Sequence, residues 1–175
     1  MRDMRRKRQQ LDEAACQEML ARGRECVLAL AGSEATDGFP YAVPVNYAFV
    51  PPTPDERGAG LCGHLLVHCA PAGAKLDAIA ADERASACVV ERADVVPEKL
   101  TTYFRSVIAF GRARLVEEDA ARRAALLALC EKYVPELSAE AVDAEIERFF
   151  RRTAILDIEL ERVTGKQSIE LVDRS

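Results

Sequence analysis

Residues 60–77, GLCGHLLVHCAPAGAKLD, predict a strand, a tight turn and the first turns of a helix. The apolar run at 61–69 is typical of a strand, the proline and glycine that follow mark a turn, and residues 73–82 carry apolar side chains at helical spacing. His68 then lies at the end of the strand and Lys75 at the start of the helix. Because the first turn of a helix leaves backbone N–H groups unpaired, this stretch suits a ligand that carries a phosphate.

Taken alone, the segment 70–75 favours an ordinary strand-to-helix turn with a solvated lysine over a phosphate site. It is not a Walker loop, and it lacks the Gly-x-Gly-x-x-Gly pattern of dinucleotide-binding turns. The phosphate hypothesis therefore depends on what the rest of the chain contributes.

The composition indicates a single domain over residues 1–175, with 49% apolar and 30% charged residues. The net charge of −5 argues against a dedicated nucleic-acid binder. No apolar run approaches the length of a membrane span, and no signal-peptide core follows the basic N-terminal arm at 1–10. We therefore expect a cytoplasmic protein that binds neither nucleic acid nor membrane, with a loosely held C-terminal tail at 164–175.

The cysteine and histidine patterns favour neither a metal site nor a hydrolase. The six cysteines contain no Cys-x-x-Cys pair, and most lie in apolar runs, so we expect buried reduced thiols. His64 and His68 would share one face of a strand roughly 13 Å apart at ~3.3 Å per residue, too far to share one ion. Cys69 and His68 are adjacent on that strand and should point to opposite faces, and no serine lies in a Gly-x-Ser-x-Gly elbow.

Hydrophobic periodicity predicts six strands and four helices. The expected strands are 25–31, 41–49, 61–69, 85–92, 103–117 and 153–162. The expected helices are 13–22, 73–82, 118–134 and 139–150, with Asp12 and Ser138 as N-caps of the first and last. We expect the segment 93–102 to be irregular. Mostly hairpin-linked strands with helices around them indicate an antiparallel barrel or sandwich of mainly β (α+β) class.

Particular residues refine these expectations. Pro44 cannot donate to a β-ladder, so its strand should be an edge, a bulge, or open to a ligand. Gly111 predicts a bulge or bend of the kind that barrels use. Helical spacing predicts that helix 118–134 turns the following side chains inward: Leu126, Leu127, Cys130, Tyr133 and Val134.

Four stretches, taken in order, carry a resemblance to a known family. They are FPYAVPVNY at 39–47, LVHCA at 66–70, GAKLD at 73–77 and YFRSVIAFGRA at 103–113. Together they resemble the flavin-binding split-barrel proteins related to pyridoxamine 5′-phosphate oxidase, and most closely the nitroimidazole-resistance (Nim-type) branch. The resemblance spans about residues 5–165, with an insertion at 50–60.

The resemblance implies a six-stranded antiparallel split β-barrel that forms a homodimer with two FMN sites at the subunit interface. It implies that Pro44, Val45, Asn46 and Tyr47 run beside the isoalloxazine ring. It also implies that Lys75 meets the flavin phosphate, with backbone from Val67, His68, Cys69, Gly73 and Ala74. Tyr103, Arg105 and Ser106 match the motif near the dimer interface, and His68 would face the ring or a substrate.

The chain departs from the family pattern at two positions. Family members often have Ser or Thr where Cys69 stands, and Arg where Ala74 stands, and both normally help to hold the phosphate. Each lost charge-assisted hydrogen bond is worth about 1.5–3 kcal/mol. The departures leave open weak flavin binding, or replacement of FMN by haem, with His68 as axial ligand, or by a deazaflavin.

The function implied is an FMN-dependent oxidoreductase that passes electrons from a reduced nicotinamide or similar donor to a small acceptor, with a nitro-aromatic as the candidate. His68 is the only catalytic residue expected, either orienting substrate or supplying a proton. Two alternatives stay open: a non-catalytic flavin or haem carrier or sensor, and a ligand-free structural relative.

Overall fold

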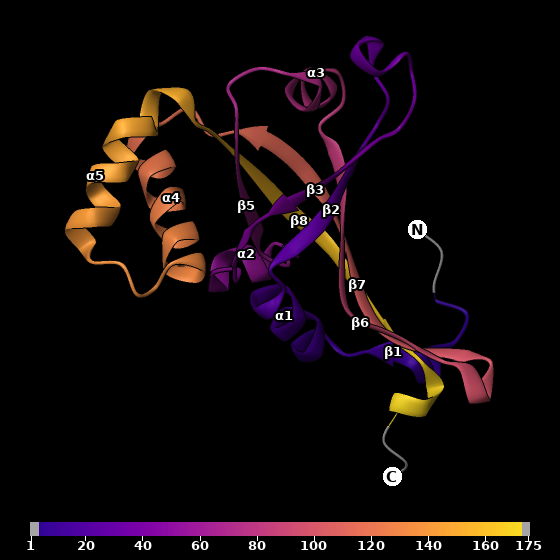
Figure 1. Ribbon diagram of the computed structural model, residues 1–175. Helices are drawn as coiled ribbons and strands as arrows, with labels where there is room; N and C mark the ends of the chain where they lie inside the picture. The colour runs from indigo at the N-terminus through magenta and orange to yellow at the C-terminus, as the bar shows by residue number, and fades with distance from the viewer. Residues whose placement is uncertain (1–3, 173–175) are drawn as a thin grey trace.

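The computed structural model describes residues 4–172 as one antiparallel sheet with helices around it (Figure 1). The strands are β1 (Gln10–Leu11), β2 (Glu25–Leu30), β3 (Tyr41–Asn46), β4 (Ala48–Val50), β5 (His64–Cys69), β6 (Arg84–Val96), β7 (Thr101–Leu115) and β8 (Ala154–Gln167). Their order in the sheet is β3-β2-β6-β7-β8-β5-β4, and β1 pairs with β8. The helices are α1 (Glu13–Arg22), α2 (Pro54–Gly58), α3 (Ala74–Ala81), α4 (Asp119–Tyr133) and α5 (Ala139–Phe149).

The two ends of the sheet are β3 and β4, which follow one another along the chain. The predicted strand 41–49 is therefore two strands, because the chain leaves β2 at Asn46, turns at Tyr47 and joins β5 from Ala48. β3 comes close to β5 without pairing with it. The result is an incompletely closed, split barrel, and the strand that carries Pro44 lies at its edge as predicted.

Aliphatic side chains from the strands fill the barrel. Leu28, Leu65, Val107 and Leu156 are fully buried there. α1 covers one part of this core with Cys16, Met19 and Leu20. The carboxylate of its N-cap Asp12 accepts a hydrogen bond from the Ala15 N–H at 2.8 Å, which confirms the predicted start of the helix.

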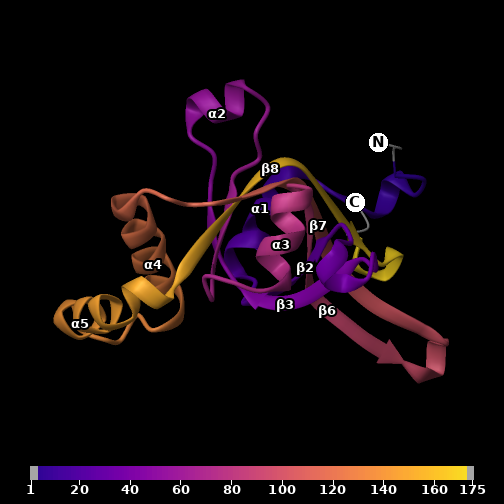
Figure 2. The ribbon, with the colours of Figure 1, turned by 90° about the horizontal axis from the view of Figure 1, so that it is seen from above.

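α4 and α5 form a pair outside the barrel, on the side opposite the β6–β7 hairpin (Figures 1 and 2). A second, smaller core joins α4 to the strands through Ala125, Leu129, Ala48 and Ile155. Leu127, predicted to point inward, is 41% exposed. The buried stripe of α4 runs through positions 125 and 129, one helical turn apart, and position 127 lies on another face of the helix. Within residues 4–172, no helix combines the length and the apolar character needed to cross a membrane.

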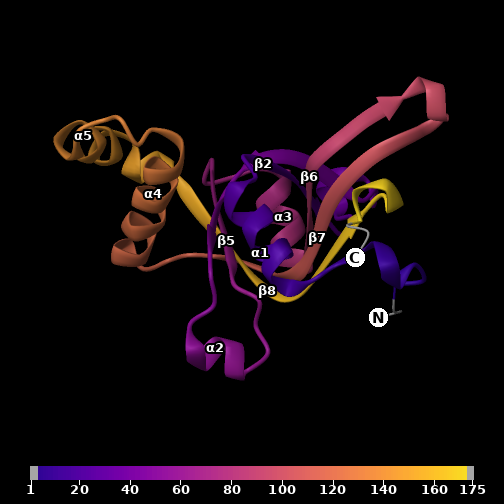
Figure 3. The same ribbon diagram turned by 90° about the horizontal axis from the view of Figure 1, so that it is seen from below.

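Two segments expected to lack regular structure belong to strands. Residues 93–102 extend β6 and β7 into a hairpin that projects from the barrel (Figures 2 and 3), closed by a turn at Pro97–Lys99. Within the tail 164–175, β8 continues to Gln167 and Ser168 is buried, because this end pairs with β1 and β7. The first three residues of the basic arm and residues 173–175 lie outside the described part of the chain. Residues 4–172 thus form eight strands, where the sequence predicted six.

Candidate functional site

A cavity of about 510 Å³ occupies the split between β3 and β5, and we call it the split cavity. Its walls come from β3, the end of β5, the start of α3 and the junction before β8. The lining residues are Pro44, Val45, Asn46, His68, Cys69, Ala70, Lys75, Arg152 and Thr153. Six of these were predicted as site residues from the sequence, and they come from three elements, β3, β5 and α3.

The split exposes unpaired strand edges. β5 pairs with β4 only through His64–Leu66, so on that side Val67–Cys69 has no partner strand among the described residues. β3 pairs with β2 alone. An open strand edge presents backbone N–H and C=O groups. The split cavity therefore offers main-chain hydrogen-bonding groups in addition to its side chains.

The N-terminus of α3 contributes further donors. Its N-cap, Gly73, makes no side-chain capping bond and has φ of +132°, a conformation that glycine adopts without strain. Lys75 lies in the first turn and close to Cys69. Burial raises the pKa of the Cys69 thiol, and the positive charge of Lys75 opposes that rise. A cation and a set of helix-terminal N–H groups thus adjoin the end of β5.

Arg152 and Thr153 were not predicted as site residues. Arg152 is exposed and, within residues 4–172, forms no ion pair. The Thr153 hydroxyl donates to the Phe149 carbonyl at 3.0 Å, which fixes the end of α5 beside the cavity. Nothing in the local sequence signals this role, because it arises only when β8 pairs with β5.

Other predicted residues lie elsewhere. Tyr47 is fully buried in the barrel core, and its hydroxyl donates to the Leu20 carbonyl at 2.7 Å, so its side chain does not face the split cavity. Val67 is also fully buried, and can contribute only backbone. Gly73 and Ala74 adjoin the cavity at the start of α3 without lining it.

Tyr103, Arg105 and Ser106 lie on β7, next to and within the β6–β7 hairpin and away from α3 (Figures 1 and 2). Arg105 donates to Gln167 Oε1 at 2.8 Å and lies 3.4 Å from a Glu91 carboxylate oxygen. The Tyr103 hydroxyl accepts from Lys99 at 2.6 Å. Within one chain, these residues do not reach the split cavity.

Two residues of α4 hold the crossing between β3 and β4. Lys132 Nζ donates to the carbonyls of Gly23 at 2.5 Å and Tyr47 at 2.9 Å. The Tyr133 hydroxyl accepts from the Tyr47 N–H at 3.1 Å and donates to the Arg24 carbonyl. Burial, to which nearby Arg24 adds a smaller effect, lowers the pKa of Lys132 to about 8. These contacts fix the chain immediately after Asn46, and sequence patterns gave no sign of them.

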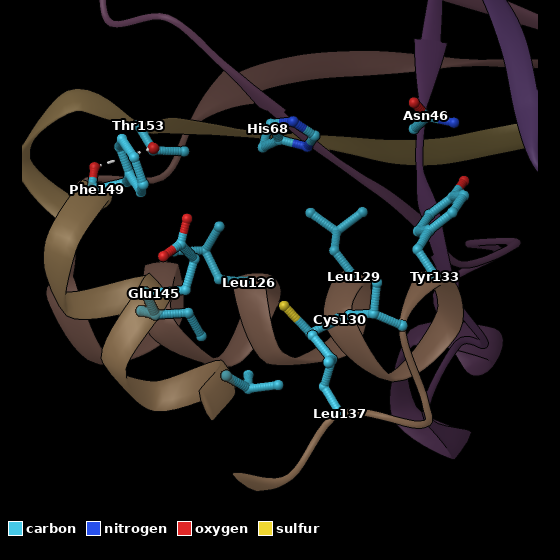
Figure 4. Close-up of a pocket in the computed structure, with 13 residues that line it drawn as sticks. Asn46, His68, Leu126, Leu129, Cys130, Tyr133, Leu137, Glu145, Phe149 and Thr153 are labelled. Atoms are coloured by element: carbon cyan, nitrogen blue, oxygen red, sulfur yellow. Dashed lines mark hydrogen bonds between the residues drawn. The ribbon is translucent and has the colours of Figure 1, made fainter. Parts of the chain in front are cut away.

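A second cavity of about 470 Å³, the helical cavity, lies between the α4–α5 pair and the strands (Figure 4). It shares Asn46, His68 and Thr153 with the split cavity. Figure 4 shows His68 above a floor of apolar side chains from α4 and α5. Among the described residues, the His68 ring makes no hydrogen bond, and the residue is exposed. His68 therefore stands where the two cavities meet.

His64, in contrast to His68, lies between two carboxylates. Its Nδ1 lies 3.0 Å from Asp157 Oδ1, and its Nε2 lies 3.3 Å from Glu56 Oε1. The hydrogen bond with Asp157 raises the pKa of His64 to about 9, against the opposing effect of burial, and Glu56 adds to the rise. Across residues 4–172, no three His, Cys, Asp or Glu side chains gather in a way that could hold a metal ion.

The sequence matches the family model described as pyridoxamine 5′-phosphate oxidase over residues 12–167. The chain belongs to this family. No curated protein matches the sequence.

Solved structures with the same fold support the architecture. A conserved hypothetical protein from Mycobacterium tuberculosis superimposes with a TM-score of 0.75 at 17% identity, covering 99% of this chain and 96% of that one. A candidate 5-nitroimidazole antibiotic resistance protein from Bacteroides thetaiotaomicron gives 0.65 at 19% identity, over 90% and 86% of the two chains. An FAD and haem binding protein from Mycobacterium smegmatis gives 0.67 at 20% identity, over 95% and 77%. At these identities, the likeness establishes the fold.

Proposed function

We propose that this protein binds FMN in the split cavity and acts as an FMN-dependent oxidoreductase. The observation that supports this most is that Pro44, Asn46, His68 and Lys75 line one cavity although they come from three different elements. Membership of the pyridoxamine 5′-phosphate oxidase family supports the same proposal. When bound, the flavin would supply the electron-transfer chemistry, and the protein would position its partners.

The phosphate end of the cofactor fits the α3 side of the cavity. Lys75 and Arg152 supply two positive charges, and the first turn of α3 supplies backbone N–H groups. Arg152 offsets the absence of an arginine at position 74 and of a hydroxyl at position 69. The residues present therefore fit a phosphate better than the sequence alone indicated.

The ring end of the cofactor fits the β3 side. Pro44 has no N–H, and Asn46 Nδ2 donates to the Arg24 carbonyl at 3.1 Å, which leaves its amide oxygen as an acceptor. His68, across the split, would orient a substrate or deliver a proton from its ring nitrogen. The acceptor that we propose is a small nitro-aromatic, and the nitroimidazole-resistance neighbour supports that choice.

The proposal includes a homodimer with two cofactor sites at its interface. Tyr103, Arg105 and Ser106 lie on β7 and do not line the split cavity of their own chain. In a dimer, the β6–β7 region of one chain would complete the site of its partner.

Haem is the second candidate for the cofactor. A protein that binds haem here would act as a non-catalytic carrier or sensor. His68 favours it, because its imidazole, which makes no hydrogen bond within residues 4–172, stands at the edge of an apolar cavity. The neighbour described as binding FAD and haem supports testing it. A deazaflavin would use the same cavity as FMN.

Spectroscopy and titration test the proposal. Absorbance of the purified protein near about 450 nm indicates flavin and near about 400 nm indicates haem, from the chemistry of the cofactors themselves. Titration with FMN, FAD, haem and a deazaflavin then measures each dissociation constant. We expect Lys75→Ala and Arg152→Ala each to weaken FMN binding at least tenfold, because a charge-assisted bond is worth about 1.5–3 kcal/mol.

Lys7→Ala, at an exposed lysine near the N-terminus, is the matched control and should change FMN affinity less than about twofold. A dissociation constant that Lys75→Ala leaves unchanged would remove Lys75 from the site. A protein that binds none of the four cofactors would contradict the proposed function.

A further inference from the structure

We propose that the helical cavity is the substrate compartment, and that it takes small aromatic molecules that are neutral or positively charged. This inference rests on the proposed function, since it names the class of molecule that meets the cofactor at His68. The inference is based on the size, the lining residues and the charge of the cavity.

The cavity has the dimensions and lining of a small-molecule site. Its volume of about 470 Å³ falls within the range of about 300–1,000 Å³ common for such sites. Apolar side chains from both helices form most of its wall, including Leu126, Leu129, Cys130, Tyr133, Ile146 and Phe149. Figure 4 shows the side chains of Leu126 and Leu129 directed toward the chain that carries His68.

The cavity exists because α5 is held away from the barrel. α4 packs on β4, β5 and β8, whereas α5 packs mainly on α4 (Figure 1). As a result, Leu137 and Phe149 line the cavity while 54% and 38% exposed. An apolar ring placed there would remove this surface from water, which favours binding by about 25 cal/mol per Å².

Polar groups lie along one side of the cavity. Asn46, His68 and Thr153 stand on the strand side, where the helical cavity meets the split cavity. A ligand that places its body between the helices therefore presents its polar end to His68.

Charge separates the two cavities. Glu145 is the only carboxylate among the residues that line the helical cavity, and its side chain points toward the strands (Figure 4). Its nearest cation, Arg148 Nη1, lies 3.7 Å away. The split cavity carries Lys75 and Arg152 instead. Anions are thus favoured on one side of His68, and neutral or cationic molecules on the other.

A pair of fluorescent probes tests this assignment. N-phenyl-1-naphthylamine is neutral, and 8-anilinonaphthalene-1-sulfonate has the same rings with an added sulfonate. Both are titrated into the full-length protein without added cofactor. We expect the neutral probe to bind, and the sulfonate to bind about fivefold more weakly, because the Glu145 carboxylate that repels it is 63% exposed and lies near Arg148.

Two pairs of variants locate the binding. Leu126→Trp fills the cavity and should lower the affinity for the neutral probe at least tenfold. Leu127→Trp, at the next and more exposed position, should change that affinity less than about twofold. Glu145→Gln should reduce the ratio of the two probes' dissociation constants about fivefold, whereas Glu147→Gln on the same helix should leave that ratio unchanged.

The outcomes separate this inference from the proposed function. If FMN binds but the two tryptophan variants bind the neutral probe equally, the inference is wrong and the proposed function stands. If the probes behave as expected but no cofactor binds, the proposed function is wrong and only the ligand class is supported. If the neutral probe does not bind and Leu126→Trp changes the mass in solution, a second copy fills the cavity and the inference is overturned.

Discussion

His64 and His68 lie four residues apart on β5, yet their environments differ. His64 is held between Asp157 and Glu56, while His68 has no hydrogen-bond partner among the described residues and stands between two cavities. Strand geometry predicted that the two histidines lie too far apart to share one ion. It did not predict which histidine is structural, because the partners of His64 come from a distant strand and an inserted loop.

His64 should make stability depend on pH. Its folded-state pKa, about 9, lies above the unfolded value of about 6.5, so its stabilisation is fully present below pH 6.5 and is lost as the pH rises through 9. We expect the free energy of unfolding to fall by about 1–2 kcal/mol between pH 6 and pH 8, measured by urea denaturation. Lys132, with a pKa lowered to about 8, is half deprotonated at pH 8, and its titration opposes this fall by only about 0.5 kcal/mol.

His64→Gln should abolish most of this fall, and His68→Gln should leave it in place, since His68 has no acidic partner among the described residues. An equal slope in wild type and His64→Gln would show that another group is responsible.

Arg152 shows why part of the site escaped prediction at the level of single residues. Lys75 could be identified because it follows a turn in a recognisable stretch. Arg152 carries no such signal, and reaches the split cavity only because β8 pairs with β5 from Cys69↔Ala154 onward. Tyr47 is the reverse case: it belongs to a recognisable strand motif, but the chain bends there and buries its ring in the core.

Among the elements, those with strong periodicity were predicted well and the ends of strands were not. α1, α4 and α5 have the predicted caps or bounds within two residues, because capping and amphipathic spacing are local properties. The hairpin extension over 93–102 is different. Its residues are largely exposed, and their strand conformation depends on pairing between β6 and β7. Local pattern cannot report such pairing.

A substitution at Gly111 would test the role of the bulge in β7. The register with β8 shifts between Phe110 and Gly111, and a Cβ at position 111 would lie 1.9 Å from the Glu159 carbonyl oxygen. We expect Gly111→Ala to destabilise the protein by at least about 2 kcal/mol, since a backbone atom cannot move aside cheaply. The measurement is the urea midpoint. Gly58→Ala, where a Cβ would meet nothing within 4 Å, should shift it by less than about 0.5 kcal/mol.

At the scale of the molecule, the two sides of the barrel have different properties. One side carries the α4–α5 pair and both cavities, and the other carries the projecting hairpin (Figures 2 and 3). The hairpin exposes apolar side chains to an unusual degree: Val90 by 58%, Val95 by 72% and Leu100 by 95%. An exposed apolar surface of this kind typically marks a contact with another protein.

The proposed homodimer would bury this hairpin, and its disruption should remove both the dimer and the cofactor site. We expect wild type to sediment at twice the 19.2 kDa chain mass, and Val95→Asp/Leu100→Asp to sediment as a monomer with FMN affinity reduced at least tenfold. Leu127→Asp places the same charge on an apolar residue of α4 that is 41% exposed, and should leave mass and FMN affinity unchanged. A double variant that stays dimeric would show that the hairpin is not part of the dimer interface. One that becomes monomeric yet binds FMN normally would place the whole cofactor site within one chain, where Lys75 and Arg152 already line the same cavity.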